Sequence, residues 1–97
     1  MLKSRKISLC FKIGEHMKIY DYNGQKNISG RRIREARQKC KLSQAELAAK
    51  MQVNGIIIER DCISRMEKGT RFIPDYELLM YSKVLGVPVT WLLGIED

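Results

Sequence analysis

The sequence has few of the residues from which enzymes and metal proteins build reactive centres. It contains one histidine, His16, and three widely separated cysteines, Cys10, Cys40 and Cys62. Without a C-x-x-C pair or a second histidine it offers no zinc ligand set, and free, reduced thiols explain the odd cysteine count best. It also lacks a nucleophile beside a histidine, paired carboxylates in a plausible site and a glycine-rich phosphate loop. We therefore expect no enzyme, no metal and no other cofactor.

Long apolar runs are also missing. None approaches the roughly 18 apolar residues that span a bilayer. Basic residues precede an apolar stretch near the start, as in a signal peptide, but Glu15 and His16 follow it without a small-residue cleavage site. The length of 97 residues, with 44% hydrophobic and 30% charged residues, fits one globular domain. These features predict a cytoplasmic protein that is not bound to a membrane.

Acidic residues are scarce in the first part of the chain. Residues 1–42 hold twelve Lys and Arg against three Asp and Glu, a formal charge of +9, whereas residues 43–97 hold six against eight, a charge of −2. The net charge of +7 favours an acidic partner, either nucleic acid or an anionic membrane surface. The uneven distribution indicates one basic end of the molecule.

Residues 1–28 differ in pattern from the rest, and we interpret them as an N-terminal extension to a domain at residues 29–97. Apolar and polar residues alternate over residues 7–13, a period-two pattern that is typical of a half-buried strand. A return strand after a turn would complete a β-hairpin. Alternatively, Met17 is the genuine start and residues 1–16 are not native. The sequence leaves both interpretations open.

After residue 28 the apolar residues recur with a helical period. Ser29 is placed to cap a helix over residues 30–40, which has an almost wholly basic outer face. Ser43 and Glu46 form a capping box that begins a helix over residues 44–51. The inward side of the first of these helices is expected to consist of Ile33, Ala36, Arg37 and Cys40.

Three more helices are expected, over residues 60–68, 75–85 and 88–93. Gly69 is a left-handed stop for the first of them, and Pro88 is the first helical residue of the last. The helix over 75–85 is expected to end at Gly86 and to have on one side Leu78, Leu79, Ser82 and Leu85. The predicted core is Leu47, Ile63, Met66, Leu78, Leu85 and Leu92.

Four sequence motifs occur in an order typical of one family. They are RIREAR at residues 32–37, LSQAELA at 42–48, ISRMEKG at 63–69 and LGVPVTWLL at 85–93. With them, residues 30–97 resemble the Cro and phage-repressor type of helix-turn-helix domain, also called xenobiotic-response-element-like. The resemblance implies an all-α, five-helix domain whose second and third helices form the helix-turn-helix.

The resemblance implies that the third helix lies in the DNA major groove, which is about 12 Å wide and accepts one α-helix. Polar residues near the start of that helix would contact base edges: Arg60, Asp61, Ser64 and Arg65. Gln44 matches the family's phosphate-contacting position at the start of the second helix, where the helix dipole favours an anion. The other expected phosphate contacts are Arg31, Arg34, Lys41, Lys68 and Arg71.

The resemblance also implies an ion pair between Arg37, late in the first helix, and Glu67, at the end of the third. Arg37 falls on the apolar stripe of its helix, where a charge would be costly unless paired. Two unrelated surface charges are the alternative. We favour the structural ion pair.

One departure from the family concerns the turn between the second and third helices. Such turns usually have three or four residues, whereas residues 52–59 intervene here, which leaves the register of the recognition helix open. This insertion is apolar, so we expect Ile56 or Ile58 to dock on the core. Exposed isoleucines that bind a partner are the alternative.

The predicted function is sequence-specific binding of double-stranded DNA by a bacterial or phage transcriptional repressor. A homodimer on a two-fold operator is expected, because so small a domain reads a longer site by pairing. The last helix, with Trp91 and Ile95, and the N-terminal strand are both candidate dimer contacts. A protein-interaction adaptor or antitoxin with the same fold is the alternative function.

Overall fold

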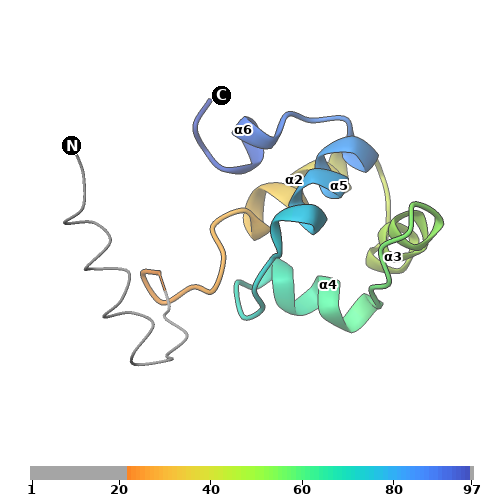
Figure 1. Cartoon of the computed structure of the whole chain (residues 1–97), viewed down its shortest axis with the longest axis horizontal. Helices are drawn as coiled ribbons and strands as arrows, with labels where there is room; N and C mark the ends of the chain where they lie inside the picture. The colour runs from red at the N-terminus through yellow and green to blue at the C-terminus, as the bar shows by residue number, and fades with distance from the viewer. Residues whose placement is uncertain (1–21, 97) are drawn as a thin grey trace, which may run out of the picture.

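The computed structural model describes residues 22–96, and five helices form its regular structure. They are α2 (Gly30–Lys39), α3 (Gln44–Val53), α4 (Arg60–Glu67), α5 (Asp75–Leu85) and α6 (Val89–Leu92). Figure 1 shows α2 and α5 between α6 on one side and α4 on the other, with α3 beside α4. The predicted all-α class is confirmed. Cys10, His16 and the predicted N-terminal strands lie outside the described residues.

Local signals in the sequence account for several helix ends. The Ser43 hydroxyl accepts a hydrogen bond from the Glu46 N–H at 3.0 Å, and the Glu46 carboxylate accepts one from the Ser43 N–H at 2.7 Å. These two bonds form the predicted capping box, which satisfies N–H groups that no helical carbonyl can reach. Gly69 and Gly86 follow α4 and α5 with φ values of +83° and +70°, a left-handed conformation that favours glycine.

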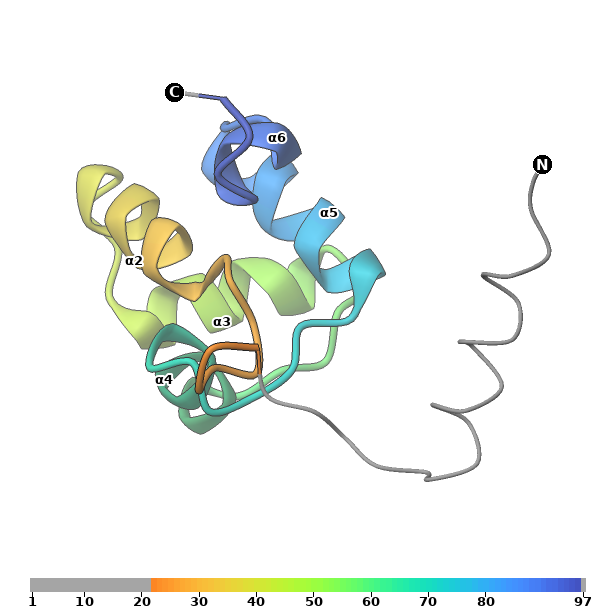
Figure 2. The same cartoon turned by 90° about the vertical axis from the view of Figure 1, so that its left-hand side faces the viewer.

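The start of α2 is capped by Asn27 and not by the predicted Ser29. Asn27 Oδ1 accepts a hydrogen bond from the Gly30 N–H at 2.7 Å, while its Nδ2 donates to the carbonyls of Met66 (3.0 Å) and Arg71 (2.7 Å). At Gly30 an added Cβ would clash with the Met66 carbonyl oxygen, so only glycine allows this approach. The segment before α2 thus ties α2 to the end of α4, as Figure 2 shows.

A single core joins the five helices. Its fully buried large side chains are Ile33, Leu47, Met51, Ile58, Ile63, Met66, Tyr81 and Leu92. Five of the six predicted core residues are buried, and Leu78 packs against them half-buried. Ile58 in the connector between α3 and α4 is 2% exposed, whereas its neighbour Ile57 is 84% exposed. The expectation that Ile56 or Ile58 docks on the core is confirmed.

The buried face of α5 differs from the predicted one. Glu77, Tyr81 and Leu85 lie four residues apart and form its buried stripe, whereas Leu79 is 49% exposed and Ser82 is half-buried. The Glu77 carboxylate can be buried because Arg71 lies 2.9 Å from it. The prediction was right for Leu85 and for Leu78, which packs against the core, and wrong for Leu79. A pattern of apolar residues does not detect a carboxylate in the core, so it missed Glu77.

Two smaller predictions are also wrong. Cys40 was expected on the inner side of α2, but it is exposed, with its Sγ 3.8 Å from the Leu85 carbonyl oxygen. Pro88 precedes α6 as its extended N-cap residue, and Val89 is the first helical residue. Pro88 still provides the backbone start of the helix, since the N–H groups of Trp91 and Leu92 both donate to its carbonyl.

Candidate nucleic-acid interface

The outer side of α4 carries the four residues predicted to contact bases. Arg60, Asp61 and Arg65 are exposed, and Ser64 is half-buried. The inner side of the same helix is anchored by Ile63 and Met66, which are fully buried. Because the two sets occupy opposite sides of one helix, core packing determines which side chains α4 presents to solvent.

The long connector before α4 is anchored to the domain. Gln52 Nε2 donates to the Ile58 carbonyl at 2.9 Å, and the Ile56 N–H donates to the Met51 carbonyl at 3.0 Å. With Ile58 also buried in the core, the connector fixes the position at which α4 begins. Because α3 continues to Val53, the connector consists of residues 54–59 and not of the predicted 52–59, and α4 packs against α3.

A buried ion pair joins α2 to the end of α4. Arg37 Nε lies 2.7 Å from Glu67 Oε2, and its second terminal nitrogen lies 3.1 Å from Glu67 Oε1. The side chains are 11% and 3% exposed. Arg37 also donates to the Leu42 carbonyl at 2.8 Å. The two charges predicted to pair are thus within bonding distance, and the same guanidinium holds the turn between α2 and α3.

Gln44 extends this ion pair to the outer side of α4. Its Nε2 donates to Glu67 Oε1 at 3.0 Å, and its Oε1 accepts from a terminal nitrogen of Arg60 at 3.2 Å. Arg60 also lies 3.5 Å from the exposed carboxylate of Asp61. A continuous set of hydrogen bonds therefore leads from the buried Arg37 to the exposed Arg60.

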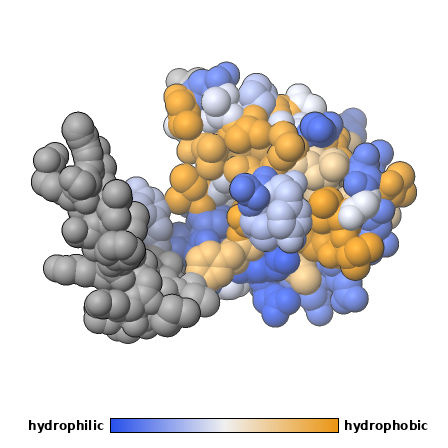
Figure 3. All heavy atoms as spheres, viewed as in Figure 1, coloured by the Kyte–Doolittle hydropathy of each residue, from blue (hydrophilic) through white to orange (hydrophobic). Residues whose placement is uncertain are grey.

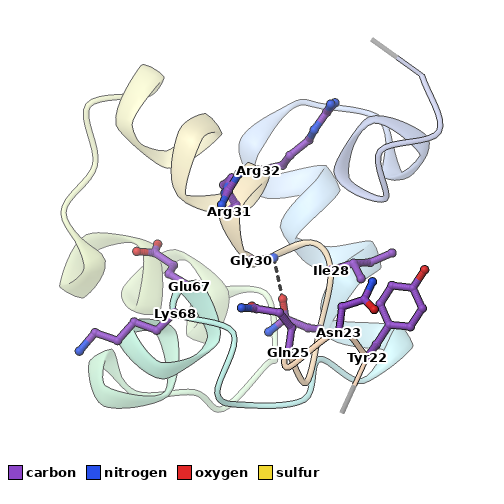
Figure 4. Close-up of a pocket in the computed structure, with 10 residues that line it drawn as sticks. Tyr22, Asn23, Gln25, Ile28, Gly30, Arg31, Arg32, Glu67 and Lys68 are labelled. Atoms are coloured by element: carbon purple, nitrogen blue, oxygen red, sulfur yellow. Dashed lines mark hydrogen bonds between the residues drawn. The ribbon is translucent and has the colours of Figure 1, made fainter. Parts of the chain in front are cut away.

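The predicted phosphate contacts other than Gln44 fall into two groups. Arg31, Arg34, Lys41 and Lys68 are exposed and available to an anion. Arg31 and Lys68 line the same open pocket of about 400 Å³, between the start of α2, the end of α4 and the segment before α2 (Figure 4). The pocket is also lined by Arg32 and by Glu67, so basic side chains outnumber acidic ones there.

Arg71 forms the second group, because it is already bonded to an acidic partner. Its terminal nitrogens lie 2.9 and 3.3 Å from the two carboxylate oxygens of Glu77, and one of them also donates to the Phe72 carbonyl. The hydrogen bond to Glu77 raises the pKa of Arg71 above its ordinary value. This guanidinium stabilises the core through Glu77, and we do not include it in the interface.

Three contacts around the site involve residues that sequence reasoning missed. Asn27 joins α2 to α4, Glu77 is the buried partner of Arg71, and Arg32 stacks on the Trp91 ring at 4.9 Å and donates to the Trp91 carbonyl at 3.1 Å. Trp91 was a candidate dimer residue, and this contact occupies one side of it. Each contact joins residues from different elements, so no local signal could have identified it.

The described part of the chain has two helices joined by a connector, the second with a polar outer side, and this arrangement defines a helix-turn-helix domain. The family model described as helix-turn-helix matches residues 33–92. The chain belongs to this helix-turn-helix family, in agreement with the predicted Cro and phage-repressor type, and is a DNA-binding regulator of that type. No curated protein and no solved structure gives a significant match.

Two further observations concern residues 22–96. None of their helices is long and apolar enough to cross a membrane. Within the same range, His, Cys, Asp and Glu side chains do not form a group of three that could hold a metal ion. Cys40 and Cys62 are free thiols.

Proposed function

We propose that the chain is a transcriptional repressor, of bacterial or phage origin, that binds a specific double-stranded DNA sequence as a homodimer in the cytoplasm. The observation that carries the proposal is the outer side of α4, where Arg60, Asp61, Ser64 and Arg65 stand together on a helix whose inner side is buried. A helix of this kind fits the major groove with its first turns against the base edges.

The side chains on α4 have the chemistry that base recognition needs. Arg60 and Arg65 can each donate two parallel hydrogen bonds to O6 and N7 of guanine, and Asp61 can accept from N4 of cytosine. Ser64 can donate or accept. These four residues are the proposed base contacts of the domain at residues 29–97.

Phosphate contacts would set the position of α4 on the duplex. We assign this role to Gln44 at the start of α3 and to the exposed basic residues Arg31, Arg34, Lys41 and Lys68. A helix N-terminus and a cationic side chain both favour a phosphate oxygen, and neither distinguishes one base pair from another. This group would therefore supply affinity, whereas α4 would supply specificity.

The proposed dimer contact is the C-terminal end of the domain. Ile95 is 71% exposed there, while the neighbouring Trp91 is engaged by Arg32. A second copy would bury Ile95 and would place two α4 helices on half-sites about one helical turn apart. An inverted repeat in the bound DNA would support this arrangement.

A selection of bound DNA sequences by the full chain tests the proposal. We expect an inverted repeat to be enriched, and Arg65→Ala to lower the discrimination at one base pair by about 1–3 kcal/mol. Lys83→Ala is the matched control, because Lys83 is an exposed cation on α5 outside the proposed interface. If the parent enriched no sequence, the repressor proposal would be wrong.

A second candidate function, a protein-interaction adaptor or antitoxin, is favoured by exposed apolar residues. Val53 at the end of α3 is 86% exposed and Ile57 in the connector is 84% exposed. Apolar side chains also gather over α5 and α6 on the face seen in Figure 3. Under the repressor proposal Ile57→Ser leaves the selected DNA sequence and the affinity unchanged. If the unmodified chain binds no DNA, the adaptor function becomes the better proposal.

A further inference from the structure

We infer that Glu67 is a positioning residue for base recognition, which acts on Arg60 through the amide group of Gln44. The inference rests on the proposed function, since it takes Arg60 to be a base contact. It adds a role for the ion pair of Arg37 and Glu67 beyond holding α2 against α4. We use the name relay for these three residues: Glu67, Gln44 and Arg60.

The relay begins at the Glu67 carboxylate, which is held in a fixed position. Glu67 is 3% exposed in its side chain, and Arg37 binds both of its oxygens, at 2.7 and 3.1 Å. Oε1 accepts a further hydrogen bond from Gln44 Nε2 at 3.0 Å. An ionised carboxylate can only accept hydrogen bonds. The NH₂ end of the Gln44 amide must therefore face Glu67.

The second step follows from the shape of the amide group. With its NH₂ end turned to Glu67, Gln44 presents its carbonyl oxygen on the opposite side, where Arg60 donates to it at 3.2 Å. An oxygen attracts a guanidinium, whereas an NH₂ group would repel it. The charge of Glu67 thus decides that Gln44 attracts Arg60.

The third step concerns the freedom of Arg60. Its side chain is 59% exposed and would otherwise sample many rotamers, and ordering such a side chain opposes binding. The bond to Gln44 uses one of its five N–H donors, and its other terminal nitrogen lies 3.5 Å from Asp61, so donors remain for a base edge. The relay therefore restricts the rotamers of Arg60 in the free protein, before DNA binds.

The experiment compares base preference in variants of the full chain. Gln44→Met keeps the side-chain length and removes both polar atoms. It leaves both Arg37–Glu67 bonds in place, although Glu67 Oε1 loses the hydrogen bond from Gln44. We expect it to lower discrimination at the base pair that Arg60→Ala also affects, by roughly tenfold, within the range of couplings between contacting residues. In the Arg60→Ala background, Gln44→Met should cause no further loss there.

Arg65 provides the additive control, because its guanidinium lies beside Cys62 Sγ at 3.9 Å and is not part of the relay. The effects of Gln44→Met and Arg65→Ala should therefore add. Glu67→Gln removes the charge that orients the Gln44 amide, and we expect it to lower discrimination at the same base pair as Gln44→Met. If Glu67→Gln does not fold, Gln44→Met still carries the test.

Two results separate failure of the relay from failure of the proposed function. A uniform loss of affinity in Gln44→Met, with base preferences unchanged, would overturn the relay and leave Gln44 as a phosphate contact. If the parent selects no sequence, the repressor proposal fails, and NMR of the free protein decides the relay. The side-chain amide signals of Gln44 should then shift in Arg60→Ala while those of Gln52, which bonds to Ile58, stay in place. Unchanged Gln44 signals would overturn the relay.

Discussion

Arg37 and Glu67 form a two-point ion pair between α2 and α4, with N–O distances of 2.7 and 3.1 Å and only 3% of the Glu67 side chain exposed. The pair joins two helices through residues that lie 30 positions apart in the sequence. Removing one partner would leave the other charge buried and unpaired. The resulting loss of stability should far exceed that from an exposed charge.

The first prediction compares two arginines on α2. Arg37→Ala should lower the free energy of unfolding by about 3–5 kcal/mol, because it strands the Glu67 carboxylate. Arg34→Ala should change it by less than about 0.5 kcal/mol, since Arg34 is exposed on the same helix. Urea denaturation measures both values. Equal losses would contradict a structural role for the ion pair.

The second prediction compares a buried leucine of α3 with an exposed leucine of α5. Leu47 is fully buried, and Leu47→Ala should cost about 2–5 kcal/mol, because the transfer and cavity contributions add. Leu79 is 49% exposed, so Leu79→Ala should cost less than about 1 kcal/mol. The two variants delete the same atoms. A large loss in Leu79→Ala would mean that α5 is rotated toward the face predicted from sequence.

The third prediction concerns the pH dependence of the α3 cap. The N–H and then the hydroxyl of Ser43 lower the pKa of the Glu46 carboxyl below its ordinary value. A depressed pKa stabilises the folded state above the unfolded pKa, and this contribution is lost as the pH falls through the folded value. Ser43→Ala should raise the pKa of Glu46 only part of the way, because the backbone N–H remains.

An NMR titration of the Glu46 carboxyl measures this change. Ser43→Thr keeps the hydroxyl and should keep the low pKa. If Ser43→Ala left the pKa of Glu46 unchanged, the cap hydroxyl would have no part in lowering it.

The fourth prediction concerns Arg31 and Arg71, both of which were expected from the sequence to contact DNA phosphate. Arg31→Ala should reduce the slope of log affinity against log salt by about 0.9, the contribution of one neutralised phosphate on double-stranded DNA. Arg71→Ala should leave that slope unchanged and lower the free energy of unfolding by about 3 kcal/mol, because Glu77 loses its partner. Binding titrations at several salt concentrations and denaturation curves measure these effects. A reduced slope in Arg71→Ala would return this residue to the interface.

Local interactions in the sequence determined where the helices lie. The capping box of Ser43 and Glu46 acts over three residues, and Gly69 and Gly86 each supply a left-handed residue where a helix ends. Such signals need no partner from elsewhere in the chain. For this reason the predicted helix ends agree with the structure to within two residues.

Tertiary structure alone decided the roles of several polar residues. Asn27 reaches Met66 across 39 residues, Gln44 reaches Glu67 across 23, and no periodic pattern encodes either contact. Glu77 is buried because Arg71 pairs with it, and that pair removes Arg71 from the exposed cations. A polar side chain is stable in the core only beside a partner. Its role therefore depends on which elements the fold brings together, whereas a helix end depends on its own neighbours.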